Sequence, residues 1–371
     1  MAAPDARLSV ARKAEFVPSP VSWHPTARRA HDQSAQALAS QALRGTASTR
    51  SMEEETIMQP TWTAADIVDL TGRRAVVTGA NSGIGFHTAL HLVAHGAHVV
   101  LACRDEGRGA EAARRIAEAI PQAPVELQVL DLADLASIRR FAVAYRERQD
   151  GLDILVNNAG VMGGPRRPTT DGFEMHFGTN HLGHFALTGL LLPSLLARPG
   201  ARVVTVSSQG AAMARIDFDN LQGERRYRWL AAYCQSKLAN LLFAFELDRR
   251  ARAANADLVS VAAHPGVATT NLLRDRHHLQ DRFLALFLRL FAPSAAQGAL
   301  PSLYAATVPA VRGSQYLGPG GFFGMRGLPT QVKPPRQALD LDTAQRLWAV
   351  SEELTGVRYD VLAQAQLADA G

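Results

Sequence analysis

The chain has 371 residues, of which 47% are hydrophobic and 20% charged, enough for the core of one large α/β domain. The net charge of +5 comes almost entirely from the first 50 residues, which hold seven of the 39 Lys/Arg and three of the 34 Asp/Glu. The remainder is nearly neutral, which argues against a nucleic-acid partner. No run reaches the roughly 18 apolar residues that an integral membrane span needs.

The first 58 residues are rich in Ala, Ser, Arg and Pro and show little hydrophobic periodicity. This composition predicts a disordered extension. An over-extended start is the favoured explanation, with translation beginning at Met52 or Met58. The composition also resembles that of an organelle transit peptide.

From Trp62 onward, short apolar runs that indicate strands alternate with helical patterns. Strands are expected at 74–77, 98–102, 125–130, 153–156, 202–206, 258–262 and 315–317. Helices are expected at 86–95, 106–119, 135–148, 171–196, 230–253 and 343–355. The alternation predicts a doubly wound α/β fold of the Rossmann type, a parallel sheet of about seven strands with helices on both faces. We expect a single domain over 59–335, followed by a C-terminal helix and tail over 336–371.

One glycine-rich turn stands between the first expected strand and its helix. It reads Thr78-Gly79-Ala80-Asn81-Ser82-Gly83-Ile84-Gly85. Glycines allow a tight turn and a close approach to a ligand, and the helix N-terminus presents unpaired N–H groups to an anion. The turn therefore predicts a site for the diphosphate of a dinucleotide.

A second motif lies inside the expected helix 230–253, where Tyr233 and Lys237 are four residues apart and share a face. An ammonium beside a phenol stabilises the phenolate and lowers the pKa of the tyrosine. Such a tyrosine exchanges a proton with a carbonyl or alcohol oxygen, which the hydroxyl of Ser208 can hold. A surface Tyr/Lys pair is the alternative explanation.

Together these motifs resemble the short-chain dehydrogenase/reductase family, and most of all its retinol-dehydrogenase-like branch. The resemblance spans about residues 70–270. It rests on the glycine turn, Asn157-Asn158-Ala159-Gly160, Thr179-Asn180-His181-Leu182-Gly183-His184-Phe185, Ser208, Tyr233-Cys234-Gln235-Ser236-Lys237 and Pro265-Gly266.

The resemblance implies a catalytic set of Asn180, Ser208, Tyr233 and Lys237, in which Asn180 positions a water beside Lys237. It also implies a cofactor site, in which Tyr233 and Lys237 take part again. The other residues of that site are Gly79, Asn81, Ser82, Gly83, Ile84, Gly85, Arg104, Asp131, Leu132, Asn158, Ala159, Gly160, Pro265, Gly266, Ala268 and Thr270. Asp131 could otherwise only cap the next helix, and Ala268 replaces the β-branched residue usual in the family.

The end of the second strand indicates which dinucleotide binds. Members of the family that prefer NAD carry an acid at the position of Cys103, and here Arg104 follows that cysteine. A guanidinium attracts the 2′-phosphate of NADP, whereas an acid would repel it. We therefore expect NADP(H), although Asp105 could partly neutralise Arg104.

The function implied is the interconversion of a carbonyl and an alcohol. Apolar residues over 271–300, the family's substrate lid, indicate a lipid-, retinoid- or steroid-like substrate, unless they are ordinary core or a dimer contact. The alternatives are a C=C reductase similar to protochlorophyllide reductase and a non-catalytic dinucleotide sensor. Long apolar helices suggest a homodimer or homotetramer. Cys103 and Cys234 match no metal or disulfide spacing, so we expect no metal and a cytoplasmic protein.

Overall fold

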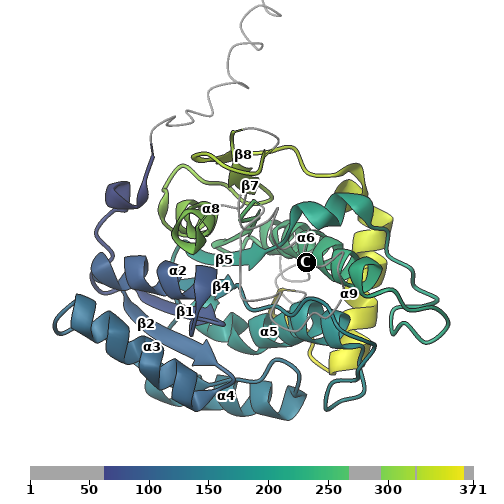
Figure 1. The fold of residues 1–371 in the computed structure, drawn as a ribbon, viewed down its shortest axis with the longest axis horizontal. Helices are drawn as coiled ribbons and strands as arrows, with labels where there is room; N and C mark the ends of the chain where they lie inside the picture. The colour runs from purple at the N-terminus through teal and green to yellow at the C-terminus, as the bar shows by residue number, and fades with distance from the viewer. Residues whose placement is uncertain (1–61, 267–293, 322–323, 363–371) are drawn as a thin grey trace, which may run out of the picture. The chain divides into compact units, whose positions relative to one another are not determined.

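The computed structural model describes residues 62–266, 294–321 and 324–362, all of them within one unit, Met58–Gly371. They form a sheet in the order β3-β2-β1-β4-β5-β6-β7-β8 (Figure 1). The strands are β1 Arg74–Thr78, β2 His98–Cys103, β3 Val125–Val129, β4 Ile154–Asn157, β5 Ala201–Val206, β6 Leu258–Ala263, β7 Tyr316–Pro319 and β8 Pro329–Gln331.

All neighbouring strands from β3 to β7 are parallel, and β8 alone runs antiparallel, against β7. The direction of winding reverses between β1 and β4, where parallel sheets of this kind bind their ligands. The doubly wound parallel fold is thus confirmed. The sequence did not predict β8 because Pro329, Thr330 and Gln331 show no apolar alternation.

Helices cover both faces of the sheet. The helices are α2 Gly83–Ala94, α3 Glu106–Ala119, α4 Leu135–Arg148, α5 Gly183–Leu196, α6 Trp229–Ala253, α8 Ala295–Thr307 and α9 Leu341–Thr355. Side chains of alternate strand residues go to opposite faces: Val77 belongs to the core shared with α2, α3 and α8, and Val76 to the core shared with α4, α5 and α6. This two-sided burial explains why the strands are continuous apolar runs.

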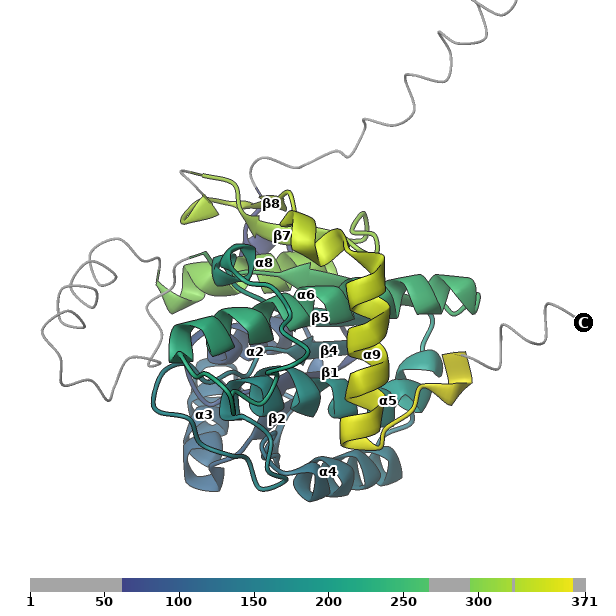
Figure 2. The same cartoon turned by 90° about the vertical axis from the view of Figure 1, so that its right-hand side faces the viewer.

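The C-terminal segment packs on α5 and α6 of its own chain (Figure 2). Trp348 of α9 stacks on Phe243 at a ring-centroid distance of 5.9 Å and meets Phe185 edge-on at 5.1 Å. Tyr359 donates a hydrogen bond to the Phe185 carbonyl at 2.7 Å. Much of the apolar surface that suggested a homodimer or homotetramer is therefore buried within the chain itself. Oligomerisation stays a prediction.

The helix expected over 171–196 starts later and contains an irregular turn. Glu174 still forms a β-bridge with Pro168, and its carboxylate accepts the Phe177 amide at 2.8 Å. A π-helical segment, Phe177–Leu182, then leads into α5. The sequence pattern alone could not reveal this capping by Glu174.

Gly183, at the start of α5, allows the helix to lie against the chain that follows β3. A Cβ atom there would come within 2.5 Å of the Leu132 carbonyl oxygen. Gly183→Ala should therefore lower the free energy of unfolding by roughly 1–3 kcal/mol, the usual effect of overpacking. Urea denaturation of both variants would measure the change.

Gly107→Ala is the matched control, because Gly107 is an exposed residue of α3 and a Cβ atom there would meet nothing closer than 3.6 Å. Alanine should stabilise that helix by about 0.5–1 kcal/mol. Equal effects of the two substitutions would contradict the close approach of α5 to Leu132.

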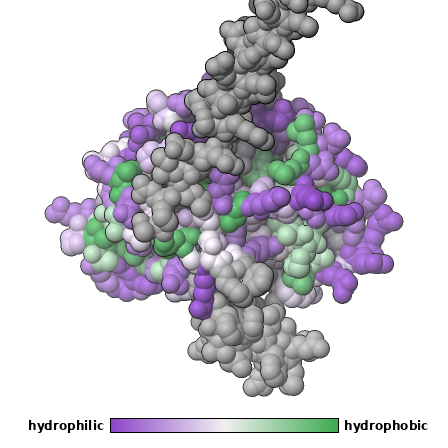
Figure 3. Space-filling view, turned by 90° about the horizontal axis from the view of Figure 1, so that it is seen from above, coloured by the Kyte–Doolittle hydropathy of each residue, from purple (hydrophilic) through white to green (hydrophobic). Residues whose placement is uncertain are grey.

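Within the described ranges, the helices are too short or too polar to cross a membrane. On the face shown in Figure 3, hydrophilic and hydrophobic side chains are interspersed. Cys103 and Cys234 are both free and buried. A cytoplasmic location stays a prediction.

Candidate active site

The polar residues singled out from the sequence meet at one edge of the sheet. The glycine turn follows β1, Arg104 follows β2, Asp131 comes shortly after β3, and Asn158 follows β4. Ser208 comes after β5 and Pro265 after β6. Because these strands are parallel, their carboxyl ends share the edge at which such sheets bind ligands.

The glycine turn is built for close approach. Gly79 and Gly83 have φ values of 66° and 60°, in the left-handed region that glycine tolerates. A Cβ atom on Gly85 would lie 2.5 Å from both the Gly79 carbonyl oxygen and Asn158 Nδ2. The side chain of Ser82 does not cap α2, so the first-turn amides of this helix are free to meet an anion.

Below the turn, a buried hydroxyl and imidazole hold the loop after β4. Thr78 Oγ1 accepts the amides of Asn158 and Ala159, each at 2.9 Å, and lies 2.9 Å from His184 Nε2. Burial lowers the pKa of His184 to about 4, so the ring is neutral. Its Nδ1 donates to the Asn180 carbonyl at 2.9 Å, which leaves Nε2 to accept from Thr78. Both residues lie in motifs quoted from the sequence, but no role for them was predicted.

Asn180 lies in the π-helical segment and fixes Val161, the residue after the Asn158-Ala159-Gly160 loop. Its side chain accepts the Val161 amide at 2.8 Å and donates to the Val161 carbonyl at 3.0 Å. It also donates to Ser236 Oγ of α6 at 2.9 Å. A Cβ on Gly160 would lie 3.3 Å from Asn180 Oδ1 and 3.4 Å from Lys237 Nζ, so this glycine allows the loop to approach both side chains.

The side chains of Ser208 and Tyr233 lie close together beside Gly210, where a Cβ atom would lie 3.6 Å from Ser208 Oγ and 3.8 Å from Tyr233 Cε1. Ser208 begins the 3₁₀ turn Gln209–Met213, and its hydroxyl accepts the Gly210 amide at 3.2 Å. Burial raises the pKa of Tyr233, and the nearby Ser208 side chain offsets only part of this rise. The phenol is therefore protonated at neutral pH.

Lys237 is almost completely buried, and its ammonium donates to the Val206 carbonyl at 3.1 Å. Burial lowers its pKa to about 8. Its Nζ lies 6.0 Å from the centroid of the Tyr233 ring. The lowered pKa expected for Tyr233 is not found, because burial outweighs an ammonium that is turned toward Val206.

The end of β2 carries a buried thiol and an exposed guanidinium. Burial raises the pKa of Cys103 to about 11, and the nearby backbone of Ala80 and Asn81 in the glycine turn offsets part of this rise. Asp105 caps α3 through the Arg108 amide at 2.9 Å and pairs with the Arg108 side chain at 3.6 Å. Arg104 forms no ion pair with any described residue, and Asp105 pairs with Arg108.

Asp131 does not cap the next helix, because the N-cap residue of α4 is Asp134. The carboxylate of Asp131 accepts the Ala133 amide at 2.9 Å, and the Asp131 amide donates to Ser137 Oγ at 3.0 Å. Leu132 is buried beside Gly183. Both residues still lie at the ligand-binding edge of the sheet.

The strand β6 is followed by His264-Pro265-Gly266, where the Gly266 amide donates to His264 Nδ1 at 3.2 Å. Gly266 has a φ of 73°, and a Cβ there would lie 2.4 Å from the Met325 carbonyl oxygen. Ala268, Thr270 and lid residues 271–293 lie outside the described residues. The end of the expected lid instead belongs to α8, whose Ala299 is buried in the core beside α2.

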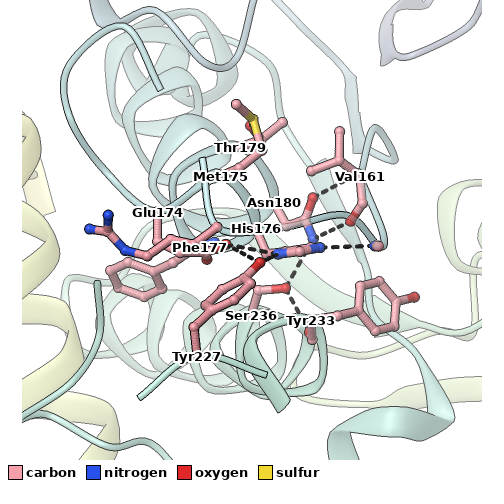
Figure 4. Close-up of polar contacts among 12 residues, drawn as sticks. Val161, Glu174, Met175, His176, Phe177, Thr179, Asn180, Tyr227, Tyr233 and Ser236 are labelled. Carbon is pink, nitrogen blue, oxygen red and sulfur yellow. Dashed lines mark hydrogen bonds and ion pairs between the residues drawn. The ribbon is translucent and has the colours of Figure 1, made fainter. Parts of the chain in front are cut away.

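A buried polar cluster next to Tyr233 was not predicted from the sequence. It consists of Glu174, His176 and Tyr227 (Figure 4). The three residues come from two separate segments, so no spacing in the sequence signals their contact. Among the described residues, no group of His, Cys, Asp or Glu is arranged to hold a metal ion.

The sequence of this chain is similar to a protein-family model and to known proteins. Residues 73–280 match the family model for short chain dehydrogenase. Human retinol dehydrogenase 12 is 43% identical over 296 residues, which cover 79% of this chain and 89% of that protein.

Two solved structures share the fold. A crystal structure of an uncharacterised protein from Mycobacterium paratuberculosis has a TM-score of 0.68 and 44% identity, and the match covers 80% of this chain and 98% of that one. The RhlG/NADP active-site complex of Pseudomonas aeruginosa has a TM-score of 0.53 and 25% identity, over 70% of this chain and 96% of that one.

Proposed function

Because the chain belongs to the short-chain dehydrogenase/reductase family, we propose that it interconverts a carbonyl and an alcohol on an apolar substrate, using NADP(H). The observation that carries the proposal is that the Ser208 hydroxyl and the Tyr233 ring both lie beside Gly210, next to buried Lys237 and Asn180. These side chains lie at the same sheet edge as the glycine turn. A proton donor is thus held where a dinucleotide would bind.

Each of these residues would have a separate role in the reaction. Ser208 holds the substrate oxygen by a hydrogen bond, and Tyr233 gives that oxygen a proton during reduction or takes one during oxidation. Lys237 lies behind the phenol, and its charge favours the phenolate left after proton donation. Asn180 holds Val161 and Ser236 in place around them. The dinucleotide, when bound, supplies or accepts the hydride.

The proposed dinucleotide site fits the residues present. The open amides at the start of α2 suit a diphosphate, and the glycines leave room for it. Arg104 is exposed and unpaired among the described residues, so its guanidinium is available for the 2′-phosphate of NADP. The neighbouring RhlG complex from Pseudomonas aeruginosa contains NADP, which agrees with this choice.

The substrate class rests on the relatives. The similarity to human retinol dehydrogenase 12 covers most of both chains and favours a retinoid or a related lipid aldehyde and alcohol. It also favours alcohol chemistry over C=C reduction. A non-catalytic sensor would have no need of a proton donor beside a serine hydroxyl and a lysine.

The test is oxidation of NADPH by the purified full chain, followed by absorbance, with a panel of retinal, straight-chain aldehydes and steroid ketones. Retinal or a long-chain aldehyde should be reduced fastest, and NADH should be the poorer donor. Activity confined to short polar carbonyls would contradict the apolar substrate. The absence of turnover with every carbonyl would contradict the reaction.

The raised pKa of Tyr233 predicts opposite responses of the two directions to pH. Reduction needs the protonated phenol, which predominates at neutral pH, whereas oxidation needs the phenolate. The rate of alcohol oxidation should therefore climb as pH rises above neutrality, about tenfold per unit while the phenol is the titrating group, and reduction should show no such climb. Initial rates in both directions, at saturating cofactor, would measure this. Parallel profiles would contradict the role of Tyr233.

A further inference from the structure

The proposed active site borders a buried cluster that the mechanism above does not use. Glu174 and His176 precede the π-helical segment and are each 1% exposed. Tyr227 lies in the loop that leads into α6, the helix of Tyr233 and Lys237. Figure 4 shows the three side chains directed toward one another beside Tyr233.

The hydrogen bonds of His176 fix its tautomer. The Gly163 amide donates to His176 Nε2 at 3.0 Å, so Nε2 carries no proton. His176 Nδ1 therefore carries it and donates to Glu174 Oε1 at 2.8 Å. Tyr227 donates to the same carboxylate oxygen at 3.2 Å. Burial acts to raise the pKa of Glu174, but the bonds from His176 and the Phe177 amide together hold it below its ordinary value.

His176 and Asn180 are one helical turn apart and hold the same loop at two points. Asn180 binds both the amide and the carbonyl of Val161, and His176 binds the amide of Gly163. These loop residues are half-buried and directly follow Asn158-Ala159-Gly160. The His176 ring also meets the Tyr233 ring edge-on, with centroids 6.3 Å apart.

We propose that His176, oriented by Glu174 and Tyr227, is a positioning residue that holds the Val161–Gly163 loop and the Tyr233 ring in the geometry that the reaction needs. This inference rests on the proposed function. An anchored loop matters here because catalysis depends on ångström-scale placement of the proton donor against the substrate. The bond to Gly163 is the essential contact, and Glu174 serves to keep Nε2 free to accept it.

Two substitutions separate the two bonds of His176. In His176→Asn, the amide nitrogen takes the place of Nδ1 and keeps the bond to Glu174, but nothing replaces Nε2. In His176→Gln, the amide oxygen takes the place of Nε2 and accepts from Gly163, whereas the bond to Glu174 is lost. His91 is a half-buried residue of α2 that lies away from the cluster, so His91→Asn is the control for the loss of an imidazole.

Without an acceptor, the half-buried Gly163 amide loses its side-chain partner. kcat/KM for the carbonyl substrate should then fall roughly 10- to 100-fold in His176→Asn, with KM raised and NADPH affinity unchanged. His176→Gln should recover most of this loss. Melting temperatures of all variants would show whether each is folded.

Hydrogen exchange of the peptide containing Val161–Gly163, measured by mass spectrometry, gives a readout without any substrate. Exchange should be faster in His176→Asn than in wild type and near wild type in His176→Gln. Unchanged exchange and kinetics in His176→Asn, equal impairment of both variants, or impairment of His176→Gln alone would each overturn the proposal. If the wild type reduces no carbonyl, the proposed function fails, and the exchange data still decide whether His176 holds the loop.

Discussion

Tyr233→Phe should lower turnover by roughly 10²- to 10⁴-fold, the usual contribution of a general acid or base. The substitution removes the phenolic hydroxyl and keeps the ring that packs against His176. Affinity for NADPH should remain nearly intact because only the proton donor is lost. Steady-state rates with the best carbonyl, together with NADPH titration by fluorescence, would measure both effects.

Tyr304→Phe is a suitable control for that experiment. Tyr304 lies on α8, where its ring meets Trp62 edge-on at 5.1 Å, on the other side of the sheet from α6. Removal of its hydroxyl should leave turnover unchanged. Near-normal turnover by Tyr233→Phe would refute the proposed mechanism, whatever the control shows.

Arg104→Ala should weaken NADPH binding by roughly 10- to 150-fold and leave NADH binding nearly unchanged. A hydrogen bond between the guanidinium and a phosphate is charge-assisted, and bonds of this class account for a change of that size. NADH lacks the 2′-phosphate and so has nothing to lose. Michaelis constants for both cofactors would be compared in wild type and mutant.

The structure supplies a control and a second variant. Arg108 lies one turn away and pairs with Asp105, so Arg108→Ala should change neither constant much. Adding Cys103→Asp to Arg104→Ala should reverse the preference to NADH. A carboxylate there would repel the phosphate and could accept a hydrogen bond from the ribose hydroxyl of NADH. Equal weakening of both cofactors by Arg104→Ala would mean that Arg104 supports the fold instead.

Much of the fold could be predicted from the sequence because its elements are strongly patterned. The helices 106–119 and 135–148 were predicted to the residue, and Asp105 and Asp134 cap them. Residues such as Arg104, Asn158 and Ser208 could also be found, because each follows a strand and parallel strands end at one edge. Tyr233 and Lys237 lie on α6 and were found from their four-residue spacing. Roles for these residues stay predictions until the variants are measured.

What could not be predicted depends on contacts between distant segments. The late start of the helix before α5 depends on Glu174, whose carboxylate caps Phe177. The pKa of Tyr233 depends on how deeply the residue is buried and on where Lys237 points. A four-residue spacing in the sequence indicates neither of these. His176 meets Gly163 and Tyr227 only after the chain has folded.

The packing of the C-terminal segment has a consequence for how the protein is made. Arg139 donates to the Thr355 carbonyl, His181 pairs with Ser351 Oγ, and Tyr359 bonds to the Phe185 carbonyl, all across more than 150 residues of chain. During synthesis on the ribosome, the aromatic side of α5 therefore stays exposed until residues 351–359 have been made. Such a late closing step exposes a nascent chain to aggregation and makes it a candidate for chaperone assistance. A premature stop before residue 351 should therefore yield insoluble protein, although every strand of the sheet would be present.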